Sequence, residues 1–296
     1  MHAPIEIDAH SGHVSAVQFA PDGKTLLSAG MDNVVKLWST ANWELINTLE
    51  GHQNGVASMT FSPDGMLLAS GSTDTMVKLW SYPSGEFVAT LKGHKKTVAA
   101  LAFSPDGQTL ASASYDATVR LWSVADQMER GVHMKHAKNV VAVVFSRDGE
   151  IVAASGVGTN IHLWLMPTGS WLASLEETHE QAVGALAMAP SGEFMVSAGF
   201  EGNVAIWSIP GWARANLIKA GTSGVSSVTI HPNEQLLATA SEHNVSIFSV
   251  ETGELVDEAK LEAKGVYSVH FSSDGRWLAV AAADKKVRVW DVSDLD

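Results

Sequence analysis

The chain contains no cysteine among its 296 residues. Disulfide frameworks, thiolate nucleophiles and cysteine-based metal sites are therefore excluded, and this composition fits a reducing compartment. No apolar run approaches the roughly 20 residues that cross a bilayer as a helix. Residues 1–10 lack the basic segment and long apolar run of a secretory signal, so we expect a cytoplasmic protein that makes no membrane contact.

Positive charge is also scarce, with 19 basic against 32 acidic side chains and a net charge of −13. Residues 1–148 carry 11 basic and 14 acidic groups, whereas residues 149–296 carry 8 and 18. Nucleic-acid affinity comes mainly from neutralising phosphates. We therefore expect no nucleic-acid partner, although the less acidic half could still present a local basic patch.

A four-residue motif ending in an aromatic residue recurs along the chain. The aromatic residues are Trp38, Trp80, Trp122, Trp164, Trp207, Phe248 and Trp290. Their successive spacings are 42, 42, 42, 43, 41 and 42 residues. A repeat of this length is typical of a propeller blade, and seven repeats fill residues 1–296 as a single domain.

Each repeat has the pattern of four short strands. In the second repeat we expect strands at 56–61, 66–70, 76–80 and 87–91. Pro63-Asp64-Gly65 separates the first two, because proline presets φ for a turn and glycine tolerates the positive φ that closes it. The expected fold class is all-β, a seven-bladed β-propeller of four-stranded antiparallel blades.

The two ends of the chain predict how the ring closes. The last repeat stops after its third strand, and residues 4–8 precede His10 where other repeats have a fourth strand. We expect this N-terminal segment to supply the missing outer strand of the last blade. Closure would remove the exposed sheet edges that otherwise favour aggregation.

The spacing of Gly-His and Trp-Asp pairs resembles the WD-repeat family over the full length of the chain. Gly51-His52 precedes Trp80 and Gly93-His94 precedes Trp122 at the family's distance, and Trp290-Asp291 keeps the literal pair. The resemblance implies a closed propeller that binds partners mainly on one rim.

Three repeats contain His, Ser, Asp and Trp at fixed offsets. The sets are His10, Ser28, Asp32 and Trp38; His52, Ser70, Asp74 and Trp80; and His94, Ser112, Asp116 and Trp122. Ser, His and Asp could form a hydrolase triad, but a triad occurs once per site whereas this set recurs in register. The family resemblance implies instead a buried hydrogen-bond chain between strands, in which every polar group has a partner.

The remaining repeats depart from this set. The fourth keeps a histidine and a tryptophan but lacks the serine and the aspartate, with His136, Ala154, Gly158 and Trp164. The fifth replaces aspartate by glutamate, with His179, Ser197, Glu201 and Trp207. The sixth has Thr239 and Phe248 at the serine and tryptophan positions. The seventh has Val280 at the serine position and keeps Asp284 and Trp290.

No Walker loop, HExxH motif or EF-hand loop is present, so we assign no catalytic, cofactor or metal residues. His133 and His136 lie close in sequence, yet a strand should hold the first and a different environment the second. Among the remaining tryptophans, we expect Trp171 and Trp277 to pack. Trp43 and Trp212 fall in turns, either half-buried or as exposed binding anchors.

The turns before the repeated aspartate carry apolar or aromatic residues where polar ones are usual. Met31, Tyr115, Val157 and Phe200 are therefore candidate partner-binding residues, with packing between loops as the alternative. Lys95, Lys96 and Lys138 follow the repeated histidines and could form a small positive area that favours acidic groups, or simply face solvent.

We conclude from the sequence that the chain is a non-catalytic scaffold, monomeric on its own, which binds proteins or peptides on the loop rim. One alternative is a regulatory or sensor subunit that recognises an acidic or phosphorylated motif. Another is an enzyme whose site lies in the central channel.

Overall fold

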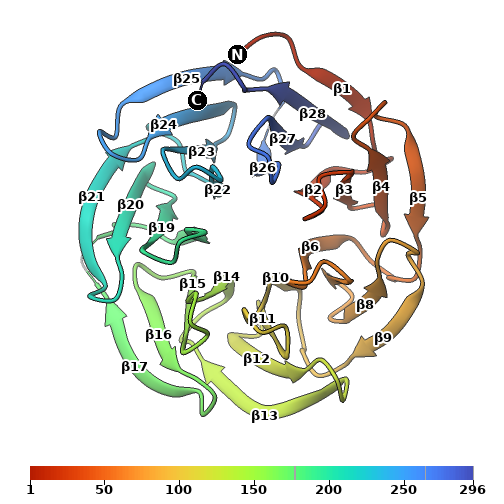
Figure 1. The fold of residues 1–296 in the computed structure, drawn as a ribbon. Helices are drawn as coiled ribbons and strands as arrows, with labels where there is room; N and C mark the ends of the chain where they lie inside the picture. The colour runs from red at the N-terminus through yellow and green to blue at the C-terminus, as the bar shows by residue number, and fades with distance from the viewer. Residues whose placement is uncertain (177, 264, 296) are drawn as a thin grey trace.

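Seven four-stranded antiparallel sheets stand around a central channel as the blades of a propeller (Figure 1). The computed structural model describes residues 1–176, 178–263 and 265–295, apart from the side chain of His133. The fold class predicted from the repeat is therefore confirmed. No helix in the described part is long and apolar enough to cross a membrane.

Blades one to six each take four consecutive strands, and blade seven takes three strands from the end of the chain and one from its start. Blades one to three contain β2 (Val14–Phe19), β3 (Thr25–Gly30), β4 (Val35–Ser39), β5 (Leu45–Leu49), β6 (Val56–Phe61), β7 (Leu67–Ser72), β8 (Val77–Ser81), β9 (Phe87–Leu91), β10 (Val98–Phe103), β11 (Thr109–Ser114), β12 (Thr118–Ser123) and β13 (Met128–Lys135). Blades four to six contain β14 (Val140–Phe145), β15 (Ile151–Gly156), β16 (Ile161–Leu165), β17 (Ser170–Leu175), β18 (Val183–Met188), β19 (Phe194–Gly199), β20 (Asn203–Ser208), β21 (Ala213–Lys219), β22 (Ser227–Ile230), β23 (Leu236–Ala240), β24 (Asn244–Ser249) and β25 (Leu255–Lys260). Blade seven contains β26 (Val266–Phe271), β27 (Trp277–Ala282), β28 (Lys286–Asp291) and β1 (Ile5–Asp8).

The second strand of each blade is almost wholly buried and the third is mostly buried, because each sheet packs against its neighbours on both faces. β3 and β11 are buried at every position, which explains their Leu, Ala and Ser content. The fourth strands form the outer circumference and expose paired apolar residues such as Leu45 and Ile46. The core is therefore divided into clusters between adjacent blades, as for Trp80, which packs with residues of blade one.

Tight turns join the first and second strands, and their third residue adopts a left-handed backbone. Gly23, Gly65 and Gly107 have φ of 68°, 70° and 70°, as the Pro-Asp-Gly turns predict. The sixth repeat has no glycine here, yet Glu234 takes the same conformation at φ 63°. Its carboxylate accepts a hydrogen bond from the Ser191 hydroxyl at 2.8 Å, which helps to hold this less favourable backbone.

The start and the end of the chain close the ring side by side (Figure 1). β1 pairs with β28 in antiparallel register, with Ile5 opposite Val289 and Ile7 opposite Val287. Across this pair, Glu6 accepts hydrogen bonds from Lys286 at 2.7 Å and from Arg288 at 2.9 Å. The predicted closure is confirmed, and it combines main-chain pairing with an ion-pair cluster.

Removing residues 1–8 should lower the midpoint of thermal unfolding and promote aggregation, because β28 would become an unpaired edge. Light scattering and a thermal melt test this. Glu6→Ala is the matched control and should cost at most about 1 kcal/mol of unfolding free energy, since Glu6 is half exposed. An unchanged melting curve for the truncated chain would contradict closure by β1.

Candidate functional site

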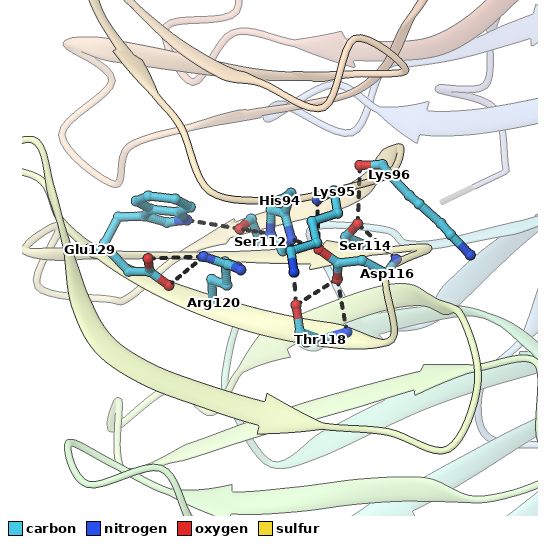
Figure 2. Close-up of polar contacts among 10 residues, drawn as sticks. His94, Lys95, Lys96, Ser112, Ser114, Asp116, Thr118, Arg120 and Glu129 are labelled. Atoms are coloured by element: carbon cyan, nitrogen blue, oxygen red, sulfur yellow. Dashed lines mark hydrogen bonds and ion pairs between the residues drawn. The ribbon is translucent and has the colours of Figure 1, made fainter.

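Four side chains from different strands and loops meet inside each complete blade. The histidine lies in the loop before the first strand, the serine in the second strand, the aspartate in the following turn, and the tryptophan near the end of the third strand. In blade three, Trp122 Nε1 donates to Ser112 Oγ at 2.8 Å, and Ser112 Oγ lies 2.7 Å from His94 Nε2. His94 Nδ1 lies 2.8 Å from Asp116, which completes the chain (Figure 2).

The same chain recurs in two further blades with nearly the same lengths. In blade one, His10 lies 2.8 Å from both Ser28 and Asp32. In blade two, His52 lies 2.9 Å from Ser70 and 2.8 Å from Asp74. The structure thus brings together the four residues of each set that the sequence singles out: Trp38 donates to Ser28 at 2.8 Å, and Trp80 to Ser70 at 2.9 Å.

Blade five completes the chain with glutamate in place of aspartate. His179 Nδ1 lies 2.5 Å from Glu201, and its Nε2 lies 2.8 Å from Ser197. Trp207 donates to the same serine at 2.9 Å. Gly199, beside the glutamate, leaves room for the longer side chain, because a Cβ atom there would overlap its carboxylate.

Protonation follows from burial and hydrogen bonding. Burial lowers the pKa of His94, and the hydrogen bond and charge of Asp116 only partly offset this. Burial alone would raise the pKa of Asp116, but hydrogen bonds from Thr118, the Lys95 amide and His94 hold it at about 2. At neutral pH a neutral imidazole therefore donates from Nδ1 to an ionised carboxylate and accepts the serine O–H at Nε2.

This geometry positions a loop and carries no hydrolytic machinery. The hydroxyl of Ser112 is fully buried and accepts the indole N–H, so it is not presented to a substrate. The carboxylate of Asp116 also accepts the backbone N–H of Lys95 at 3.0 Å. The chain of bonds therefore fixes the loop before the blade against the turn after its second strand.

Incomplete blades leave polar groups unpaired or redirect them. In blade four, the buried His136 Nε2 atom has no hydrogen-bond partner among the described residues, because Ala154 replaces serine. In blade seven, Val280 likewise leaves the buried Trp290 indole N–H without a described partner. Asp284 of the same blade pairs with Arg288 at 2.6 Å. Because Arg288 also contacts Glu6 of β1, the Asp284 carboxylate supports ring closure.

Met31, Tyr115, Val157 and Phe200 all lie exposed on one face. Their exposed fractions are 50, 38, 43 and 43 %. Each donates its backbone N–H to the loop that enters its own blade, as Tyr115 does to Thr97 at 3.0 Å and Phe200 to Ala182 at 2.9 Å. The turns and the entering loops therefore form one continuous surface, which we call the loop face.

Two of these side chains also pack against neighbouring loops. Met31 lies over Gly55 of blade two, where a Cβ atom would overlap its sulfur. The ring of Phe200 lies against Gly184 and Gly224. Packing between loops, the alternative weighed from the sequence, is thus confirmed for both residues, which also remain partly exposed. Partner binding by them stays a prediction.

Lys95, Lys96 and Lys138 are exposed in the loops that enter blades three and four. The backbone carbonyl of Lys96 accepts a hydrogen bond from the Ser114 hydroxyl at 3.2 Å. The Lys96 side chain extends away from the buried hydrogen bonds (Figure 2). The loop of blade five places an acidic residue, Glu180, on the same face. Three lysines thus lie together in the entering loops of blades three and four, and a further exposed lysine, Lys285, lies in the turn of blade seven.

One exposed aromatic residue of this region, Tyr267, was missed from the sequence. It is 40 % exposed near the start of β26 and stacks on His13 with ring centroids 6.2 Å apart. Corresponding positions in other blades hold Ser15, Ala57 or Ala99. A comparison of first strands, in addition to turns, would have identified it as the outlier.

The tryptophans outside the repeated motif divide into packed and exposed residues. Trp43 and Trp277 form an edge-to-face pair with centroids 5.2 Å apart, and Trp212 is half-buried against the cluster between blades four and five. The prediction that Trp171 packs is wrong, since 65 % of it is exposed. It lies on β17, an outer strand, where no further blade layer covers that face.

The central channel encloses about 550 Å³ and is lined by the first strands of all seven blades. Small and hydroxyl side chains such as Ser58 and Thr60 dominate it. His270 lines it as well, and burial lowers the pKa of this histidine to about 4. In the described residues, no group of three His, Asp or Glu side chains could hold a metal ion.

Comparison with known proteins identifies the repeat. Seven segments match the family described as "WD domain, G-beta repeat": residues 4–39, 43–81, 85–123, 130–164, 169–208, 215–249 and 257–291. A mouse protein, WD repeat-containing protein 1, is 43 % identical over 70 residues, which is 23 % of this chain and 12 % of that protein. A coronin-like protein of Saccharomyces cerevisiae is 40 % identical over 72 residues, which is 24 % of this chain and 11 % of that protein.

A third relative, the target of rapamycin complex subunit wat1 of Schizosaccharomyces pombe, is 30 % identical over 77 residues. That alignment covers 25 % of this chain and 24 % of the relative. The chain thus aligns with a quarter or less of each of these relatives. None of these three relatives has the name of an enzyme.

Asp74→Ala should lower the free energy of unfolding by about 1–3 kcal/mol, because it leaves the buried His52 Nδ1–H and the Gln53 amide without their acceptor. Urea unfolding measures the loss. Asp8→Ala, at a side chain 93 % exposed, is the control and should change stability little. Equal stability of the two variants would show that the buried chain contributes nothing.

Stability should fall as pH is lowered from 6.5. Burial lowers the pKa of His10, His52, His94, His136, His162 and His270 in the folded chain, that of His136 to about 3. The unfolded chain, whose histidines titrate near 6.5, binds more protons below that pH, so acid favours unfolding. Folding also lowers the pKa values of Asp32, Asp74 and Asp116, so below about pH 4 the unfolded chain binds protons at these groups first and stability falls further.

Melting temperatures measured from pH 7.5 to 4.5 test this expectation. His136→Asn should flatten the dependence, because it removes a group that must stay neutral. A melting temperature that rises on acidification would contradict the assignment of neutral, buried histidines.

Proposed function

The chain belongs to the WD-repeat family, and from this premise we propose that it is a non-catalytic scaffold that binds protein segments on its loop face. The single observation that supports this best is the exposure of Met31, Tyr115, Val157 and Phe200 at equivalent turns of four blades. Exposed apolar side chains grouped on one face are typical of protein-binding surfaces.

Rigidity of the loop face favours binding. The buried hydrogen-bond chains of blades one, three and five fix the loops that carry Met31, Tyr115 and Phe200. Val157 lies in blade four, whose chain is incomplete. A preorganised surface loses little conformational entropy when a partner binds. Tyrosine, as at Tyr115, is one of the side-chain types enriched among residues that dominate interface energy. Phenylalanine, as at Phe200, is enriched at the cores of interfaces.

The positive area around Lys95, Lys96 and Lys138 supports a preference for acidic partner segments. It lies beside the turn of Tyr115 on a protein whose net charge is −13. Local charge of opposite sign steers an acidic segment to this part of the face and raises the association rate. In that case the chain acts as the sensor subunit of a complex, and a partner carries the activity.

Membership of a complex is supported by one relative, which is named as a subunit of the target of rapamycin complex. We propose a cytoplasmic location and a monomeric propeller that assembles with other proteins. The central channel is the alternative site for catalysis, and an enzymatic screen of the isolated chain addresses it directly.

Tyr115→Ala should reduce recovery of partner proteins by affinity capture at least about tenfold, as loss of an interface anchor does. Trp171→Ala is the matched control, because it removes a larger exposed aromatic side chain from the outer circumference. Phe200→Ala should weaken capture too. Because Phe200 also packs against Gly224, a melting curve of this variant is needed to separate loss of binding from loss of stability. Full recovery with Tyr115→Ala and loss with Trp171→Ala would move the interface from the loop face to the circumference.

A further inference from the structure

Blade four has a pocket where its hydrogen-bond chain is incomplete. The pocket encloses about 300 Å³ beside the loop before β14 and the turn between β15 and β16. His136, Lys138, Val157, Gly158 and His162 are among its lining residues. This volume lies at the lower end of the range found for small-molecule binding sites.

The repeat shows what the pocket lacks. At a spacing of 42 residues, Gly158 stands where blade three has Asp116, and His136 stands where it has His94. The carboxylate of Asp116 accepts hydrogen bonds from His94, from the Lys95 amide at 3.0 Å and from the Thr118 amide at 3.1 Å. Blade four therefore lacks the acceptor of this arrangement.

The corresponding donors are still present in blade four. The amides at the positions of Lys95 and Thr118 are those of Ala137 and Asn160, and neither donates to another described residue. His136 has also lost both of its usual partners, and its ring instead lies against His162, with centroids 4.8 Å apart. Burial keeps its pKa low, so the ring is neutral and has one N–H to donate.

Glycine keeps this space open. A Cβ atom at Gly158 would meet nothing within 4 Å, and the backbone there is not in the left-handed region that excludes other residues. An aspartate would thus fit without strain. The vacant volume, with donors on its walls, is complementary to a carboxylate.

The surrounding charges are mixed. Lys138 lines the pocket and Lys135 ends β13 just before it, whereas Glu176 contacts Asn160 at 3.4 Å. His162 is fixed by Ser174 at 2.8 Å, and burial lowers its pKa. The exposed lysine favours an anion, and the exposed glutamate partly opposes it.

We propose that the pocket of blade four binds a carboxylate group, which takes the place that the repeated aspartate occupies in blades one to three. The carboxylate comes from a small organic acid or from an Asp or Glu side chain of another protein. The pocket shares Val157 and Lys138 with the loop face. The proposed contacts are instead the His136 ring and the Ala137 and Asn160 amides, so carboxylate binding does not require that the apolar side chains of the loop face bind a partner.

The test uses the whole chain and two probes, acetate and N-acetyl-aspartate N-methylamide, followed by NMR of the His136 ring and the Ala137 amide. Both probes should give saturable shifts at these two groups. Sodium chloride at equal ionic strength should not. Stronger binding of the aspartate probe indicates a protein side chain as the source, and equal binding indicates a free acid.

Gly158→Asp supplies the missing carboxylate within the chain. It should abolish the shifts caused by both probes and raise the melting temperature. Gly158→Asn is the matched control, which fills the same volume without charge and should give a smaller rise. Ala154→Ser, which restores the partner of His136 Nε2, should stabilise the blade and still allow probe binding.

Three results would overturn the proposal. The first is no saturable shift at His136 or Ala137 in the wild-type chain. The second is undiminished probe binding by a folded Gly158→Asp variant. The third is that inorganic phosphate or Zn²⁺ binds at these groups and acetate does not, because the pocket would then recognise different chemistry.

Discussion

The pairing of β1 with β28 is the constraint on which the rest of the structure depends. Each blade buries its two faces against its neighbours, so blades one and seven have complete cores only when the ring is closed. The main-chain bonds of Ile5 and Ile7 join the two ends of the chain, and Glu6 adds ion pairs with Lys286 and Arg288. With β1 in place, β28 is no longer an edge strand, and the short strands of the closed ring form a stable, rigid body.

Within that ring, the buried hydrogen-bond chains give local order to the loops. Leaving any member unpaired in a low-dielectric interior is costly, so a complete set holds its loop in one conformation. Blades one, two, three and five are complete, whereas blades four, six and seven have each lost members. The departures have different outcomes, because Asp284 is engaged in closure whereas Gly158 leaves a pocket.

The residues proposed to bind a partner lie where the repeat varies. A blade needs its small, buried second strand and its turn glycine, and these positions change little along the chain. The turn residue before the aspartate has no such requirement, and it holds Met31, Tyr115, Val157 or Phe200 in four blades. The loop face is therefore a surface on which recognition residues can vary without cost to the fold.

The sequence by itself determined the number of blades, their strands and the closure by residues 4–8, because a 42-residue period repeats its strand and turn pattern in register. It placed the strands of the second blade to within two residues of Leu67–Ser72 and Val77–Ser81. The four-residue sets were also visible, because their offsets are constant. These features depend on local spacing, which a sequence records directly.

Only the tertiary structure decided what the side chains meet. It showed Trp171 exposed, Phe200 resting on Gly224 of the next blade, and Tyr267 stacked on His13 across the junction of blades seven and one. It also showed that replacing Asp and Ser by Gly158 and Ala154 leaves a pocket instead of a collapsed loop. Such outcomes depend on contacts between residues far apart in the chain, and spacing along one repeat carries no information about them.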